Sequence, residues 1–225
     1  MNIARNPVVD SPLSRAFTEV EMLIYSEPYT RRTARLGVTL TREDDAYMLD
    51  VTTARNAPEI LYRLAAVLYV HKWDIHSAEI CTLDNNEIRD RFVIRPVIGM
   101  VAVDELLFDR MMDDFERLIF DKESVLGYIG THGKNLPNGM SDDCHVDFRP
   151  EGDCTFVTVR GMDRPGLLLS LCQVFTMMEI DILEARINTE PGGRAANSFL
   201  VNPCDRRFIN REFRDRVREA VRSTL

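Results

Sequence analysis

The sequence predicts an α+β fold in which one small unit of strands and helices is built twice. The first observation is an internal repeat, because Pro58–Pro96 aligns with Pro165–Pro203 without a gap. Self-similarity at a fixed offset is the sequence signature of a repeated structural unit. The second observation is that apolar residues alternate in some stretches and recur at helical spacing in others. The third is a glycine-rich stretch between the copies, which predicts a linker at 124–144.

The repeat keeps the residues of a packed core and its turns. Of the 39 aligned positions, eleven are identical. They are Pro58/Pro165, Leu61/Leu168, Leu64/Leu171, Val67/Val174, Asp74/Asp181, Ile75/Ile182, Ala78/Ala185, Ile80/Ile187, Thr82/Thr189, Phe92/Phe199 and Pro96/Pro203. Most are apolar or turn residues, so the repeat preserves a packing plan rather than a catalytic set.

Length and composition favour two domains of a cytoplasmic protein. A chain of 225 residues accommodates two domains of about 100 residues. A formal charge of −8 argues against nucleic acid and anionic membranes as partners. There is no apolar run of about 20 residues that could span a bilayer, and the first residues lack the apolar core of a signal peptide. Five scattered cysteines predict free thiols in a reducing compartment, with neither metal nor cofactor expected.

Residues 1–35 are predicted to form an N-terminal helix and a loop. Ser11-Pro12 is typical of a helix start, with a capping hydroxyl before a proline. Apolar residues then recur at helical spacing from Leu13 to Ile24. Residues 26–35 follow as a loop with a basic tip.

Repeat 1, at 36–123, is predicted to run strand–strand–helix–strand–strand–helix. Tyr47, Leu49 and Val51 alternate as in a half-buried strand of a hairpin, and Asp104 can cap the last helix. The predicted elements are strands at 36–41 and 46–53, a helix from Pro58, strands at 74–83 and 88–94, and a helix after Asp104.

Repeat 2, at 145–225, is predicted to have the same order. Its elements are strands at 146–148 and 154–160, a helix from Pro165, strands at 182–189 and 197–201, and a helix from about Asn210. The strands before the aligned region match repeat 1 only with an offset one residue larger, as in Val51 against Val159. A bulge or a one-residue change in the turn before Pro58 would absorb this difference.

Two helices on one face of a four-stranded antiparallel sheet form the ferredoxin-like arrangement. With Asp163-Arg164-Pro165-Gly166-Leu167-Leu168 between a core strand and its helix, the repeat resembles the ACT domain, a regulatory module that binds amino acids. The run His145–Leu168, with its extra leading strand, is most similar to the tandem ACT pair at the C-terminus of the PII-protein uridylyltransferases. A plant family of ACT-repeat proteins is also similar. The resemblance implies two such repeats paired side by side in one larger antiparallel sheet, with head-to-tail pairing between chains as the alternative.

The catalytic parts of those uridylyltransferases have no counterpart in this sequence. We find neither a nucleotidyltransferase Gly-Ser signature followed by an acidic pair nor any His-Asp dipeptide. The expectation is therefore a sensor part without an enzyme.

The turn before the helix of repeat 2 suits a zwitterion. Pro165 sets a helical backbone angle, and Gly166 removes a side chain where a ligand would approach. The N–H groups of Gly166, Leu167 and Leu168 are expected to lack partners within the helix, so they can hold a carboxylate.

Asp163, just before this turn, can accept a hydrogen bond from the ligand ammonium, and the resemblance adds Arg164 to the motif. In the resembled family, ligands sit at this turn, commonly at an interface between two ACT units. The structural alternative is that Asp163 caps the helix and Pro165-Gly166 only makes the turn.

Repeat 1 departs from the motif. Its corresponding run includes Asn56, Ala57, Pro58 and Glu59. Asn56 keeps a polar cap, but Glu59 places bulk and negative charge where a carboxylate would bind, although it suits the helix dipole. We expect a stable helix start here, with a degraded or altered ligand site.

The leading hypothesis is a non-enzymatic regulatory protein that binds a small amino acid in repeat 2 and signals to a protein partner. Glutamine is suggested by analogy with nitrogen sensing. One alternative is an interaction or oligomerisation scaffold without a ligand, for instance a homodimer. Another is a sensor fragment or paralogue of a PII uridylyltransferase.

Overall fold

The structure, a computed structural model, describes residues 27–54, 59–83, 87–98, 103–121, 123–137, 143–201 and 206–224. The expected helix between Leu13 and Ile24 lies outside these residues. The described elements are β1 (Tyr29–Arg32), β2 (Leu36–Glu43), β3 (Ala46–Thr53), α2 (Ile60–Val70), β4 (Trp73–Thr82), β5 (Ile88–Pro96), α3 (Glu105–Phe120), α4 (Val125–Thr131), β6 (His145–Glu151), β7 (Cys154–Met162), α5 (Leu167–Met177), β8 (Ile182–Glu190), β9 (Arg194–Val201), a 3₁₀ turn (Arg206–Ile209) and α6 (Arg211–Arg222).

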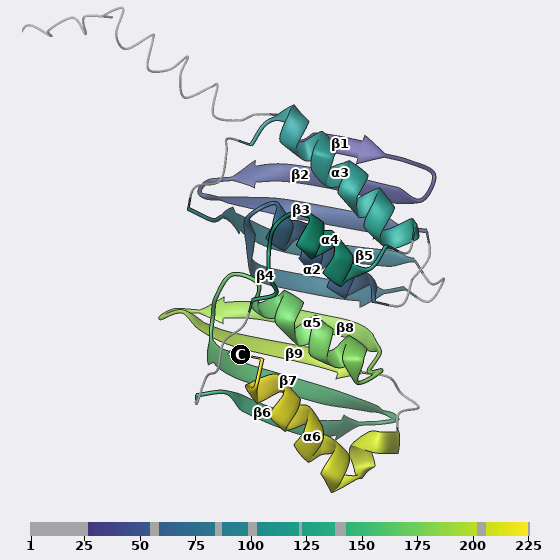
Figure 1. The fold of residues 1–225 in the computed structure, drawn as a ribbon, viewed down its shortest axis with the longest axis vertical. Coiled ribbons are helices and arrows are strands. Elements are labelled where there is room, and N and C mark those ends of the chain that lie inside the picture. The colour runs from purple at the N-terminus through teal and green to yellow at the C-terminus, as the bar shows by residue number, and fades with distance from the viewer. Residues whose placement is uncertain are drawn as a thin grey trace, which may run out of the picture.

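The described strands form one antiparallel sheet of nine strands in the order β1-β2-β3-β5-β4-β8-β9-β7-β6. The helices lie together on one face of this sheet (Figure 1). The predicted α+β class is confirmed. Within the described part of the chain, no helix is long and apolar enough to cross a membrane.

An approximate twofold axis relates the two halves of the sheet. The halves meet where β4 pairs with β8, and Glu79 lies opposite Arg186 at the centre of that pairing. These two residues are separated by the same 107 positions as the sequence repeat, so the axis passes between them. The larger offset of the leading strands is also visible, because Val38 pairs with Val51 as Val146 pairs with Val159.

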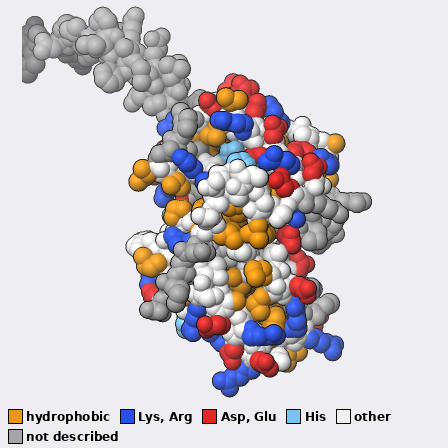
Figure 2. All heavy atoms as spheres, viewed as in Figure 1, with side chains coloured by type: hydrophobic (Ala, Val, Ile, Leu, Met, Phe, Trp, Pro, Cys, Tyr) orange, Lys and Arg blue, Asp and Glu red, His pale blue; other side chains and the backbone are white. Residues whose placement is uncertain are grey.

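The core lies between the sheet and the helices. Alternate residues of the strands point inward, and apolar side chains from α2 and α5 pack onto them; Phe175 of α5 stacks edge-on against Phe199 of β9, with ring centroids 4.9 Å apart. Hydrophobic side chains are visible near the middle of the helix-bearing face, where the halves meet, and Lys and Arg side chains gather at the end that carries α6 (Figure 2).

Each half buries one polar side chain at the same position of its sheet. Asp90 on β5 and Asn197 on β9 are 107 positions apart, and both are almost completely buried. The backbone N–H of Cys81 donates to Asp90 Oδ1 at 3.3 Å, and that of Asn188 donates to Asn197 Oδ1 at 3.4 Å. Among the described residues, the second carboxylate oxygen of Asp90 has no hydrogen-bond partner, so this half leaves a buried acceptor unpaired.

Two segments differ from the sequence prediction. The loop expected at 26–35 is wrong for Tyr29–Arg32, which forms edge strand β1 against β2; Tyr29 stacks on Phe108 of α3. The stretch predicted as a linker contains α4, whose start is capped by the Ser124 hydroxyl accepting from Gly127 N–H. Packing of α4 against α2 stabilises a helix that its glycines alone would disfavour.

Candidate functional site

The turn between β7 and α5 carries the predicted ligand residues. The Asp163 N–H donates to the Gly193 carbonyl at 2.8 Å. Its Oδ1 accepts from the Arg164 N–H at 2.8 Å, and its Oδ2 accepts from the hydroxyl of Thr189 on β8. The structural alternative in which Asp163 caps the helix is wrong, because the N-cap of α5 is Gly166 and that cap makes no side-chain hydrogen bond. Asp163 instead ties the turn to the sheet.

The helix begins two residues later than its proline suggested. Gly166 has φ 83°, a left-handed conformation through which a right-handed helix cannot run, so α5 starts at Leu167 and Pro165 lies in the turn. The Leu167 N–H donates to the Arg164 carbonyl at 3.0 Å. The N–H group of Leu167 is therefore not free, contrary to expectation. Leu168 lies in the first turn of the helix, where N–H groups have no intrahelical partner.

Gly166 is needed at this turn for two physical reasons. Its φ angle is one that side-chain-bearing residues rarely adopt. In addition, a Cβ atom here would lie 2.5 Å from Cγ of Pro137 and 3.0 Å from the ring of Tyr69. The group that approaches the glycine is thus the protein's own chain.

We call residues 134–137 the strap, because they cross from α4 to the start of α5. The hydroxyl of Ser170 donates to the Pro137 carbonyl at 3.0 Å, and that of Tyr69 donates to the Asn135 carbonyl at 3.1 Å. Lys134 Nζ donates to the Tyr69 carbonyl at 2.7 Å and lies 4.8 Å from the centre of its ring. These contacts hold the strap over the turn.

Arg164 is a cation whose partners are carbonyl groups. Its Nη2 donates to the Thr224 carbonyl at 2.9 Å and lies 3.5 Å from that of Pro137. Its Nε is buried and has no hydrogen-bond partner in the described ranges. Burial lowers the pKa of the Arg164 guanidinium, as expected for a charge withdrawn from water without an anion beside it. Among the described residues, no carboxylate pairs with Arg164.

A small pocket lies between this turn and the end of α2. Its walls include Tyr69, Asp74, Asp163, Arg164 and Asn197, and its free volume is about 10 Å³, close to the space for one water molecule. Burial raises the pKa of Asp74, and the negative charge of Asp163 raises it further. This pocket thus brings together the Asp74 carboxylate, whose pKa is raised, and the Arg164 guanidinium, which no carboxylate of the described residues pairs with, around a nearly closed space.

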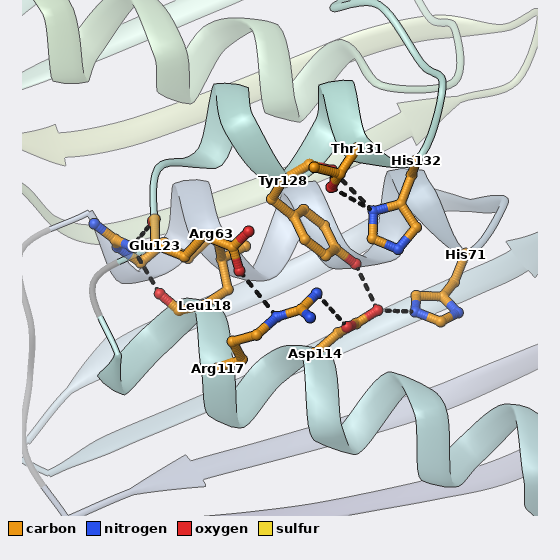
Figure 3. Close-up of polar contacts among 9 residues, drawn as sticks. All are labelled: Arg63, His71, Asp114, Arg117, Leu118, Glu123, Tyr128, Thr131 and His132. Atoms are coloured by element: carbon orange, nitrogen blue, oxygen red, sulfur yellow. Dashed lines mark hydrogen bonds and ion pairs between the residues drawn. The ribbon is translucent and has the colours of Figure 1, made fainter.

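A buried polar network holds α4, the helix that leads into the strap (Figure 3). Asp114 Oδ2 is 2.8 Å from Nε2 of His71 and accepts from the Tyr128 hydroxyl at 2.8 Å. Asp114 Oδ1 accepts from Arg117 at 2.9 Å. Burial raises the pKa of Asp114, but the hydrogen bonds from His71 and Tyr128 outweigh it and hold the pKa below its usual value. Helices α2, α3 and α4 therefore meet at one carboxylate.

The corresponding turn of the first half is described only from Glu59 onward; Asn56, Ala57 and Pro58 lie outside the described residues. Glu59 has φ 65° and is the N-cap of α2, as Gly166 is of α5. Its carboxylate pairs with Arg63 Nη2 at 3.0 Å. The 107-residue offset thus places a glutamate in the conformation that glycine adopts in the second half.

Sequence reasoning missed Asp74, Tyr69 and the strap as parts of this site. Asp74 had a signal, because it is one of the residues identical in both repeats. The strap had none, since its contacts with the turn join segments far apart in the sequence. Within the described ranges, no group of three or more His, Cys, Asp or Glu residues could hold a metal ion.

Comparison with known proteins supports the family resemblance. No family model matches the chain. It is 23% identical over 170 residues to the bifunctional uridylyltransferase/uridylyl-removing enzyme of Haemophilus influenzae, covering 74% of this chain and 19% of that protein. The enzyme of the same name from Pasteurella multocida is 23% identical, with 76% and 20% covered. That from Acinetobacter baumannii is 26% identical, with 75% and 19% covered.

The expected relationship to the uridylyltransferases is thereby confirmed, and the chain spans about a fifth of the length of the curated relatives it matches. A crystal structure of an unknown protein from Galdieria sulphuraria matches at 13% identity and a TM-score of 0.27, covering 78% of this chain and 92% of that one.

Proposed function

We propose that this protein is a non-catalytic regulatory module that binds a small amino acid at the β7–α5 turn and signals its presence to a protein partner. The observation that carries the proposal is the pairing of unmet charges in one pocket. Arg164 has a buried Nε without a hydrogen-bond partner among the described residues, and burial, together with the negative charge of Asp163, raises the pKa of Asp74. An amino acid brings one charge of each sign.

In this arrangement Arg164 and the Leu168 N–H hold the ligand carboxylate, while Asp74 and Asp163 accept from its ammonium group. Charge-assisted hydrogen bonds of this kind are about twice as strong as neutral ones. The helix dipole at the start of α5 favours the carboxylate end. Following the family resemblance, glutamine is the first amino acid to test, and the two repeats are ACT-like units paired side by side.

The strap connects binding to a signal. With a free volume of about 10 Å³, the pocket must widen to admit an amino acid, and the proposed opening is a movement of the strap away from Gly166, beside which Pro137 lies. A ligand that binds the open form shifts the population toward it. Since the strap follows α4 directly, its release changes the surface that the helix-bearing face offers to a partner.

The second candidate function is a scaffold without a ligand, and the closed pocket favours it. In that reading Pro137 takes the place of a ligand permanently, and the paired halves serve oligomerisation, including a homodimer through the sheet edges β1 and β6. Unpaired strand edges invite such association. A sensor fragment or paralogue of a PII uridylyltransferase is the other alternative, and the similarity to the uridylyltransferases supports it.

A thermal-shift titration with all twenty amino acids distinguishes the two functions. A ligand at 100 times its dissociation constant adds about 2.7 kcal/mol to the free energy of unfolding. The sensor function predicts a clear increase in melting temperature with one or a few amino acids. No increase with any of them would favour the scaffold.

A further inference from the structure

A second pocket lies between the two halves, at the opposite ends of α2 and α5. It has a volume of about 490 Å³, within the range of sites for small organic molecules. Its walls are mainly apolar. The apolar lining residues are Ile60, Leu61, Tyr62, Ile80, Ile88, Cys172, Phe175, Ile180 and Ile182.

This pocket is the twofold counterpart of the closed one beside Gly166. We call the pocket beside Gly166 the closed pocket and this second one the open pocket. The offset of 107 residues maps Tyr69 of the closed pocket onto Thr176, and Trp73 onto Ile180. Thr176 and Ile180 both line the open pocket. The open pocket therefore has smaller side chains at the two positions where large aromatic side chains line the closed pocket.

The charges of the open pocket have one sign. Glu59, Glu179 and Asp181 line it, and the described lining includes neither Lys nor Arg. Glu59 is paired with Arg63, and Arg207 donates to the backbone carbonyl of Glu179. Asp181 is exposed at the rim of the pocket and makes no side-chain hydrogen bond or ion pair within the described part of the chain, and partial burial of its carboxyl group raises the pKa of that group. A cation beside Asp181 would remove that penalty.

The same charges exclude a ligand carboxylate. Glu59 occupies the N-cap of α2, the position from which a helix start would otherwise attract an anion. An amino acid would bring its carboxylate toward this glutamate. A ligand whose only charged group is an ammonium would bring no carboxylate toward this glutamate.

We propose that this pocket binds a small organic cation with an apolar body, such as a branched alkylamine, whose ammonium group pairs with Asp181. The apolar body packs against Ile180, Ile182 and the walls from α2. This site is separate from the proposed amino-acid site and does not depend on it.

Calorimetric titration of the full chain with isopentylamine and, separately, isovalerate tests the proposal. Both probes have the same branched body and opposite charge. Isopentylamine should bind, and isovalerate should not bind measurably at the same concentrations. Absence of heat with isopentylamine at millimolar concentration, or equal affinity for isovalerate, would overturn the proposal.

Four variants locate the binding. Asp181→Asn should weaken isopentylamine binding about tenfold or more, the loss expected for one charge-assisted hydrogen bond, whereas Asp153→Asn, an exposed aspartate in the β6–β7 turn, should not. Thr176→Tyr, which copies Tyr69, should abolish binding. Its control Met177→Tyr changes a neighbour that is 75% exposed and should leave the affinity unchanged. Unchanged affinity in both Asp181→Asn and Thr176→Tyr would show that the amine binds elsewhere.

Discussion

The Cβ atom that Gly166 lacks would lie 2.5 Å from Cγ of Pro137. Two segments 29 positions apart in the sequence therefore touch at the start of α5, beside the pocket that Asp74, Asp163 and Arg164 line. A glycine that the sequence motif associates with a ligand is, in this state, required by the protein's own strap.

Gly166→Ala should destabilise the fold more than Gly192→Ala. Both glycines have positive φ, at 83° and 94°, which costs an alanine about 1–2 kcal/mol. Only Gly166 has neighbours where a Cβ would lie, since nothing is within 4 Å at Gly192. Denaturant unfolding measures both penalties, and in a Pro137→Ala background the excess penalty at Gly166 should decrease. Equal penalties at the two glycines would contradict the close contact.

Tyr128→Phe should lower the free energy of unfolding by about 2 kcal/mol, the value for a hydrogen bond to a charged group. The Tyr128 side chain is completely buried, and its hydroxyl donates to Asp114. Removing it leaves the carboxylate with one buried donor fewer. Chemical denaturation of the variant beside wild type gives the number, and a loss below about 0.5 kcal/mol would show that the network does not hold α4.

The lowered pKa of Asp114 predicts that the folded state loses stability in acid. Its pKa is lowered in the folded state, so the carboxylate contributes stability above its unfolded pKa, near 4, which is lost as the pH falls through the lower folded value. Asp114→Asn should flatten the acid limb of the stability profile. Asp113→Asn, an exposed neighbour, should leave that limb unchanged; equal flattening by both would contradict the assignment.

The raised pKa of Asp90 predicts a pH dependence of stability with the opposite sign. Burial raises its pKa to about 7, so between about pH 4 and 7 the folded state binds more protons than the unfolded state, and stability falls as pH rises. Asp90→Asn should stabilise the fold at pH 8 by up to about 4 kcal/mol. The converse variant, Asn197→Asp, should introduce the same dependence into the other half. A pH-independent effect of Asp90→Asn would show that the carboxyl does not titrate in this range.

The fold class and most elements follow from the sequence because alternation and helical spacing report which face of each element is buried. Asp104 caps α3 as predicted, accepting from the Leu107 N–H at 2.7 Å. Strand β1 was missed because only Tyr29 of its residues is partly buried, which leaves no alternating pattern. Helix α4 was missed because Gly127 and Gly130 mask the spacing of Val125, Tyr128 and Ile129.

The candidate site could be predicted only in part. The residues of the turn were found from the motif, but their hydrogen bonds depend on partners such as Thr189, Pro137 and Thr224 that local sequence does not specify. The difference between the two halves was expected from Glu59 and Gly166. Which pocket is open depends instead on Thr176 and Ile180 occupying the positions that Tyr69 and Trp73 occupy in the other half, and that becomes visible only when both halves are folded together.

Exchanging the two N-cap residues tests which half binds an amino acid. Gly166→Glu should abolish amino-acid binding, because it places a carboxylate at the start of α5 where the ligand carboxylate is proposed to lie. Glu59→Gly should leave that binding unchanged. Calorimetric titration of each variant with the amino acid that stabilises wild type measures the effect. If Glu59→Gly abolished binding while Gly166→Glu left it intact, the assignment to the second half would be wrong.

The most direct test of the amino-acid site is the ratio of dissociation constants between Arg164→Gln and wild type, measured by isothermal calorimetry, beginning with glutamine and extending to the other amino acids. The buried Nε of Arg164 is the group proposed to hold the ligand carboxylate. Its replacement should weaken binding about tenfold or more, as for loss of a charge-assisted hydrogen bond. Equal affinity in Arg164→Gln and wild type, or no heat with any amino acid, would contradict the proposed site.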